Sequence, residues 1–176
     1  AELVSRLETM VADVTATVTA DRGLIDAGAR VAHVSEVIDV NIGPAARIVG
    51  AARLCNGTIL SESGARTEVG QGVIAEDFIF AEGASVEDGV VIHTGFVGQG
   101  AQLGKQFSAE NSLFFANSEA FHGEACAVFA GPYTVTHHKS TLLIAGIYSF
   151  YNAGSGTNQS NHMYKLGPVH QGIIQR

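Results

Sequence analysis

The sequence predicts an all-β fold, a parallel β-helix built from six-residue repeats. From residue 97 the chain divides into sixes whose first residue is almost always apolar. These first positions are Val97, Leu103, Ala109, Phe115, Phe121, Ala127 and Tyr133. A period of six is neither the about 3.6 residues of a helix nor the period of a simple strand, and a fixed short period is the signature of a solenoid. In a β-helix each six forms one side of a coil, and its inward residue stacks on its counterpart one coil later.

The composition favours a narrow solenoid core. Of the 176 residues, 46% are hydrophobic but only 7% are aromatic, and Trp is absent. We therefore expect a core of Val, Ile, Leu and Ala within one domain. The 21 glycines suit tight corners, where the backbone needs positive φ.

Charge and hydropathy argue against two classes of partner. The net charge is −7 and no Lys or Arg cluster occurs, so we expect no nucleic-acid partner. No apolar run approaches the ~20 residues that span a bilayer, and no signal peptide opens the chain, so we expect no membrane partner. Cys55 and Cys126 lie far apart, which favours reduced thiols and a cytoplasmic protein. The abrupt ends of the chain indicate a segment of a longer protein.

Residues 1–23 break the repeat and predict an amphipathic helix. Its apolar residues recur at spacings of three and four, and they are Leu3, Leu7, Met10, Val11, Val14 and Val18. Three β-branched threonines weaken its second half, and Gly23 is the expected left-handed cap at its end. Because an open coil end exposes backbone donors and acceptors, we expect this helix to cap the solenoid.

Residues 24–146 are predicted to form the repeat domain. Sixes begin at Ile25, with one five-residue step at Val37–Asn41. The spacing is poor in Leu60–Glu68, which predicts an extended turn there. At about 18 residues per coil, the stretch holds roughly seven coils.

Residues 147–176 have no period of six and are predicted to form an irregular arm. A long irregular segment beside a regular solenoid is usually functional or disordered. The arm holds three of the four tyrosines and several aliphatic residues, which argues against disorder. We expect it to cross a face of the solenoid or to re-enter a last coil at Val169–Ile174.

The repeats resemble those of the bacterial hexapeptide-repeat transferases. In that family an aliphatic residue is followed by Gly or an acidic residue, two variable residues and a small one. Residues Val86–Val91, Val97–Gln102, Leu103–Ser108 and Ile42–Arg47 match this pattern. The resemblance implies a left-handed parallel β-helix, assembled as a homotrimer. The tail Asn158–Gly172 is distantly similar to an uncharacterised branch near the sugar-1-phosphate acetyl- and nucleotidyltransferases.

Histidines supply the candidate chemistry. Five of the seven lie after residue 120, namely His122, His137, His138, His162 and His170. Imidazole can take or give a proton near neutrality. The resemblance implies a His that deprotonates the acceptor, which then attacks the thioester of acetyl-CoA while backbone N–H groups stabilise the oxyanion. No covalent acyl-enzyme is needed, so no catalytic triad is expected.

His162 and His138 are the candidate bases. His162 lies among amide side chains that suit the hydroxyls of a sugar, and Lys165 offers a point charge for a phosphate. The candidate substrate-binding residues are Asn158, Gln159, Asn161, Tyr164, Lys165 and His170. The structural alternative is that these amides only close turns in an irregular loop. His138 ends the repeat run at a coil corner, where a surface His is a candidate base.

Three functions stay open at this stage. The first is an acyl-CoA-dependent acyltransferase acting on an amino sugar or nucleotide-linked sugar, with acetyl-CoA as co-substrate and a sugar or sugar phosphate as partner. The second is a non-catalytic scaffold or regulatory β-helix. The third is a trimeric, metal-dependent hydratase, because hexapeptide carbonic anhydrases bind zinc through three histidines. The spacing of the histidines here lacks their close pair, so we assign no metal ligand.

Overall fold

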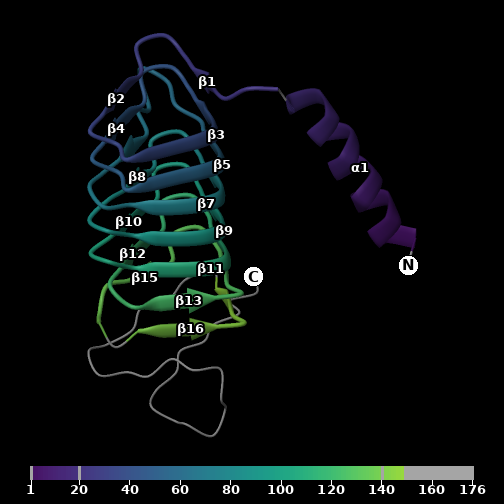
Figure 1. Ribbon diagram of the computed structural model, residues 1–176. Coiled ribbons are helices and arrows are strands. Elements are labelled where there is room, and N and C mark those ends of the chain that lie inside the picture. Colours follow the sequence, from purple (N-terminus) through teal and green to yellow (C-terminus); the bar gives the residue numbers. More distant parts are fainter. Residues whose placement is uncertain (1, 20, 140, 149–176) are drawn as a thin grey trace, which may run out of the picture.

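The protein is a parallel β-helix with one N-terminal helix, and the computed structural model describes residues 2–19, 21–139 and 141–148 (Figure 1). The strands facing the viewer run from left to right while the chain descends, so the coil is left-handed, as predicted (Figure 1). Within the described residues, no helix is long and apolar enough to cross a lipid bilayer.

The elements comprise one helix and seventeen short strands in the described residues. The helix is α1 (Glu2–Val18). The strands are β1 (Leu24–Ile25), β2 (Arg30–Ala32), β3 (Glu36–Ile42), β4 (Arg47–Val49), β5 (Arg53–Ile59), β6 (Glu68–Val69), β7 (Ile74–Phe80), β8 (Ser85–Val86), β9 (Val91–Val97), β10 (Gln102–Gly104), β11 (Ser108–Phe114), β12 (Glu119–Phe121), β13 (Glu124–Cys126), β14 (Phe129–Ala130), β15 (Val135–Thr136), β16 (Leu142–Ile144) and β17 (Ile147–Tyr148).

Two parallel sheets make the three sides of the coil. The seven-residue strands of the first sheet, in the order β1-β3-β5-β7-β9-β11-β13-β16, bend at their middle residue, so each supplies two sides. We call the residues before the bend the first side and those after it the second side. A seven-stranded sheet, β15-β12-β10-β8-β6-β4-β2, forms the third side. Its seven strands mark seven coils, which confirms the predicted number.

The repeat is 17 residues long, one fewer than three sixes. Ile74 pairs with Val91, and Val91 pairs with Ser108. The bend uses a single residue with positive φ, such as Asn111 (φ 49°), and this removes one residue from a six. The predicted phase is therefore wrong beyond residue 109: Phe114 is buried inside the coil (1% exposed) where Phe115 was expected. Tyr133, also predicted to point inward, is 62% exposed.

The predicted extended turn lies between β5 and β6. Arg53 pairs with Ile74, which makes this coil 21 residues long. The four additional residues lie in Leu60–Glu68, where Glu62 and Ala65 form an isolated bridge. Buried Thr67 holds the base of the turn, because its hydroxyl lies 2.6 Å from the Leu60 carbonyl oxygen and 3.0 Å from that of Ala81.

Aliphatic columns fill the coil, as predicted from the composition. One column on the first side is Leu54, Ala75, Ile92, Ala109, Ala125 and Leu143, and all six are buried. Three phenylalanines are also fully buried: Phe80, Phe107 and Phe114. Phe107 and Phe114 pack edge to face, with ring centroids 5.7 Å apart. Burial of these columns is the main source of stability, because apolar area leaves water along the full length of the coil.

The predicted helix is present, but its apolar face stays exposed within the single chain. Leu3 is 71% exposed and Val14 is 57% exposed, and α1 extends beside the coil instead of across its end (Figure 1). The first coil is also uncovered, since Leu24 is 56% and Ile25 is 61% exposed. A capping contact of α1 with its own coil is therefore not formed in this arrangement.

Candidate functional site

Most of the predicted site residues lie outside the described part of the chain. These are His162, Asn158, Gln159, Asn161, Tyr164, Lys165 and His170. Their roles stay predictions. The coil itself continues through β17, which pairs with β14.

His138 lies just after the last strand of the third side. It is half-buried, and its ring centroid is 4.7 Å from that of His137. The His138 carbonyl accepts a hydrogen bond from the N–H of Thr141 (3.0 Å). Among the described residues, no carboxylate forms an ion pair with either ring. His138 thus lacks the orienting acid that usually accompanies a catalytic imidazole.

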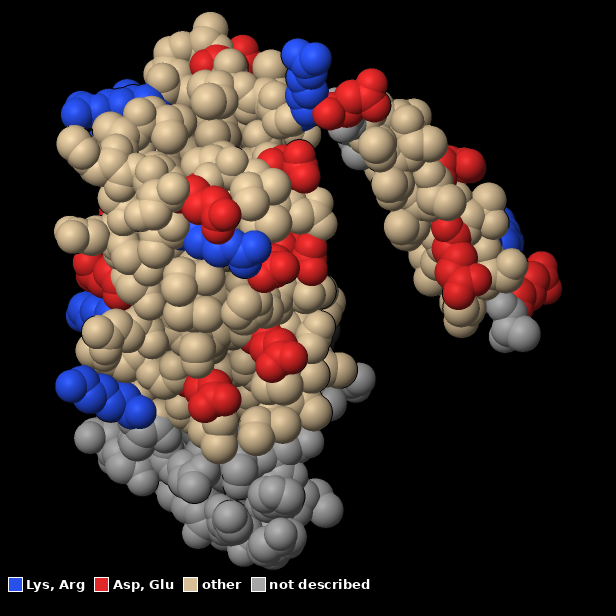
Figure 2. Space-filling model, in the orientation of Figure 1, with Lys and Arg blue, Asp and Glu red and all other residues tan. Residues whose placement is uncertain are grey.

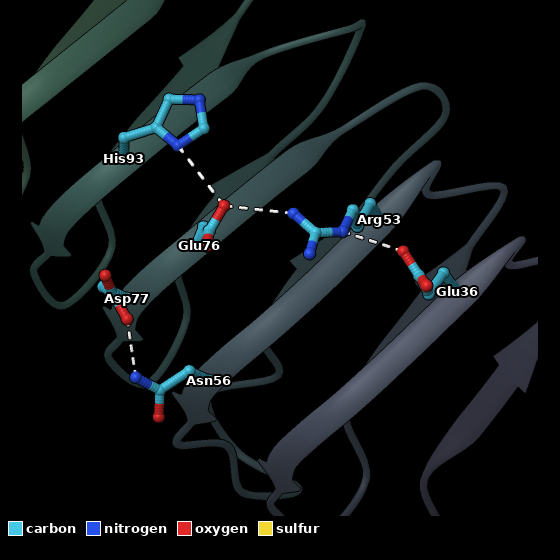
Figure 3. A network of polar contacts seen from close by, with 6 residues as sticks. All are labelled: Glu36, Arg53, Asn56, Glu76, Asp77 and His93. Atoms are coloured by element: carbon cyan, nitrogen blue, oxygen red, sulfur yellow. Dashed lines mark hydrogen bonds and ion pairs between the residues drawn. The ribbon is translucent and has the colours of Figure 1, made fainter.

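A polar ladder crosses the outer surface of the first side. Strands of a parallel sheet stack about 4.8 Å apart, so residues one repeat apart lie side by side. Glu76, His93 and Glu110 occupy one outward column in this way. The Nδ1 atom of His93 lies 3.8 Å from Oε2 of Glu76. Figure 3 shows the imidazole and the carboxylate facing each other from adjacent strands.

Arg53 fixes the carboxylate of Glu76. Its Nη1 donates to Oε2 of Glu76 at 3.0 Å, and its Nε donates to Oε2 of Glu36 at 2.7 Å (Figure 3). Hydrogen bonds from Glu36 and then Glu76 raise the pKa of Arg53, which therefore stays cationic. We call Glu36, Arg53, Glu76 and His93 the charged ladder.

The charged ladder has the geometry of an oriented base. A carboxylate near Nδ1 favours the tautomer with its proton on Nδ1, which leaves Nε2 as the acceptor. The His93 side chain is 51% exposed, so a solute can reach it from solvent. A proton acceptor held in this way is suited to general-base chemistry.

The bend beside the charged ladder forms a second polar column. Asp39, Asn56, Asp77, Thr94 and Asn111 all adopt positive φ there, which Asn and Asp tolerate better than most residues. Nδ2 of Asn56 donates to Oδ1 of Asp77 at 2.5 Å (Figure 3). This column places carboxylates and amides within one residue of His93 along the strand.

A groove of ≈ 550 Å³ runs along the bend and the second side. Its polar wall includes Asp39, Asn56, Asp77 and Thr94, and its apolar wall includes Ile79, Phe96 and Leu113. Arg22 lies at its end near α1. Carboxylate and amide groups can bind hydroxyls and amines, so the groove suits a polar, amine-bearing solute.

Acidic side chains dominate the charge of the first side. Figure 2 shows several Asp and Glu side chains and fewer Lys and Arg side chains over its strands. An acidic surface attracts a cation and repels a phosphate. Within the described residues, no group of three or more His, Cys, Asp and Glu is arranged to hold a metal ion.

The sequence interpretation missed the charged ladder because it used the wrong period. Read in sixes, His93 was assigned to a coil corner. Glu76, His93 and Glu110 are spaced 17 residues apart, which is the true repeat length. A search for polar residues at that spacing would have aligned them on one face.

No curated protein and no solved structure matches the chain. One protein family matches along the whole of residues 1–176. The chain with this left-handed coil and charged ladder thus belongs to the family described as a domain of unknown function (DUF4954).

Proposed function

We propose that the protein is an acyltransferase that transfers an acetyl group from acetyl-CoA to an amino sugar. The observation that carries the proposal is the charged ladder at the edge of the groove, in which Arg53 and Glu76 hold His93 as a base. The resemblance to hexapeptide-repeat transferases supplies the reaction type and the co-substrate. A homotrimer and a cytoplasmic location belong to the same proposal.

The acidic groove favours an amine over a phosphate in the acceptor. Asp77 and Asn56 offer oxygens and an amide for the hydroxyls of a sugar. Glu76 and Asp77 offer negative charge to an ammonium group before it loses its proton. Arg53 is committed to two carboxylates, which leaves Arg22 as the cation at the groove for a phosphate of the co-substrate.

The proposed reaction needs one proton acceptor and no covalent enzyme intermediate. Nε2 of His93 takes a proton from the acceptor amine while the amine nitrogen attacks the thioester carbonyl. The tetrahedral intermediate then collapses, the C–S bond breaks, and the thiolate of CoA leaves with the proton that His93 returns. Glu76 stabilises the imidazolium that forms between the two steps.

The test measures acetyl transfer to a panel of amino sugars by the release of free CoA thiol. We expect His93→Gln to lower kcat/KM by about 100-fold or more, as for loss of a general base. His137→Gln is the matched control, since His137 is also an exposed imidazole but has no carboxylate beside it, and it should keep the activity. His162→Gln and His138→Gln test the bases predicted from the sequence.

Two results would contradict the proposal. Calorimetry that detects no binding heat with any acyl-CoA would favour the alternative, a non-catalytic scaffold. Activity that survives in His93→Gln but disappears in His162→Gln would move the base to the arm.

A further inference from the structure

An apolar stripe lies on the second side of the coil. It consists of one outward residue from each of five successive coils: Ile79, Phe96, Leu113, Phe129 and Ile147. Four of them are 37–65% exposed and Phe96 is half-buried. Phe115 joins two of them, with ring centroids 5.6 Å from Phe96 and 4.7 Å from Phe129. A continuous apolar surface of this kind marks an interaction site more often than scattered apolar residues do.

The helix α1 offers a second apolar surface without a partner. Leu3, Leu7, Met10, Val11 and Val14 lie on one of its faces and are 48–71% exposed. The two surfaces also match in length. Leu3 to Val14 spans about 17 Å at about 1.5 Å per residue, and the stripe spans about 19 Å over four steps of about 4.8 Å.

Within one chain these two surfaces do not meet. A Cβ on Gly23 would lie 2.7 Å from the carbonyl oxygen of Val40, so the chain is held against the coil there. The Leu24 N–H also donates to Oδ1 of Asn41 at 3.2 Å. From this anchor α1 runs outside the coil, and open space separates the two (Figure 2).

We infer that the apolar stripe binds α1 of a second copy of this chain. Each copy offers one helix and one stripe that its own geometry keeps apart, so an exchange between copies satisfies both. The partner helix would lie along the apolar wall of the groove, opposite Asp39, Asn56 and Asp77. His93 lies on the first side, so the exchange leaves the charged ladder open, and the inference stands without the proposed acyltransferase.

The first experiment measures the self-association of the full chain by analytical ultracentrifugation. We expect the unaltered chain to assemble and the double variant Leu7→Glu, Val14→Glu to weaken self-association by at least about 100-fold. The matched control is Thr9→Glu, Ala16→Glu, which adds the same charges to the opposite face of α1. Ile79→Glu, Ile147→Glu should weaken assembly as strongly, because it changes the stripe instead of the helix.

The second experiment identifies the donor of the helix. In a background of Cys55→Ser and Cys126→Ser, one sample carries Leu7→Cys and another carries Leu113→Cys. After mixing and mild oxidation we expect a disulfide-linked dimer of the two variants on a non-reducing gel. The chain that carries both cysteines reports a helix that folds onto its own coil.

Three outcomes would overturn the inference. The first is a chain that stays monomeric even at high protein concentration, with a native circular dichroism spectrum. The second is an assembly that neither the helix variant nor the stripe variant weakens. The third is a disulfide that forms only within single chains.

Discussion

Phe78 shows how single residues adjust the inside of the coil. It is 2% exposed, and its neighbours in the same inward column are Gly57 on one strand and Gly95 on the next. The large ring therefore occupies the space that two missing side chains leave. This alternation of large and small residues keeps the packing dense without widening the coil.

This packing predicts different effects for two glycine substitutions. We expect Gly57→Ala to lower the free energy of unfolding by about 1–3 kcal/mol, because its Cβ would overlap the ring of Phe78. Gly64→Ala is the matched control, since a Cβ there meets nothing within 4 Å. It should leave stability unchanged or raise it by up to about 1 kcal/mol. Urea unfolding followed by circular dichroism measures both, and equal losses would refute the packing argument.

The extended turn shows that an element can lengthen without disturbing its neighbours. β5 and β7 pair through six registered residues on either side of the bend although 21 residues separate each pair. The additional residues project from the corner, while Thr67 stays buried in the column of the third side. The coil therefore tolerates insertion at a corner but not within a side.

We expect deletion of residues 62–65 to preserve the fold. The shortened coil would have the common length of 17 residues, and the free energy of unfolding should change by less than about 1 kcal/mol because shortening a loop has a small entropic effect. Deletion of residues 87–90, which removes part of a 17-residue coil, is the control and should prevent folding. Thermal melts of the two variants measure the difference. Loss of the native spectrum in the first deletion would show that the turn itself is structural.

At the scale of the whole molecule, stability accumulates coil by coil. Each coil contacts only the coils above and below it, so the molecule behaves as a one-dimensional array. The first coil has one such neighbour, and its Leu24 and Ile25 are more than half exposed. The central strands β7, β9 and β11 pair on both edges.

This gradient predicts the pattern of amide hydrogen exchange. Amides of β7 and β9 should exchange most slowly and those of β1 and β2 fastest, because terminal coils open without unfolding the centre. Exchange measured by mass spectrometry on peptides of the native protein tests this order. Uniform protection along residues 24–130 would indicate a single cooperative unit instead.

The sequence by itself determined the kind of coil, the terminal helix, the extended turn and the aliphatic core, because each leaves a local pattern in the order of residues. The phase of the repeat was not accessible in this way. One bend residue per coil, such as Asn111 at φ 49°, shortens the repeat to 17 and moves the inward position to Phe114. Only the tertiary structure brought Arg53, Glu76 and His93 together and left α1 apart from the apolar stripe. These relations depend on the register between strands and on the direction of the chain at Gly23, and neither is encoded in the spacing of neighbouring residues.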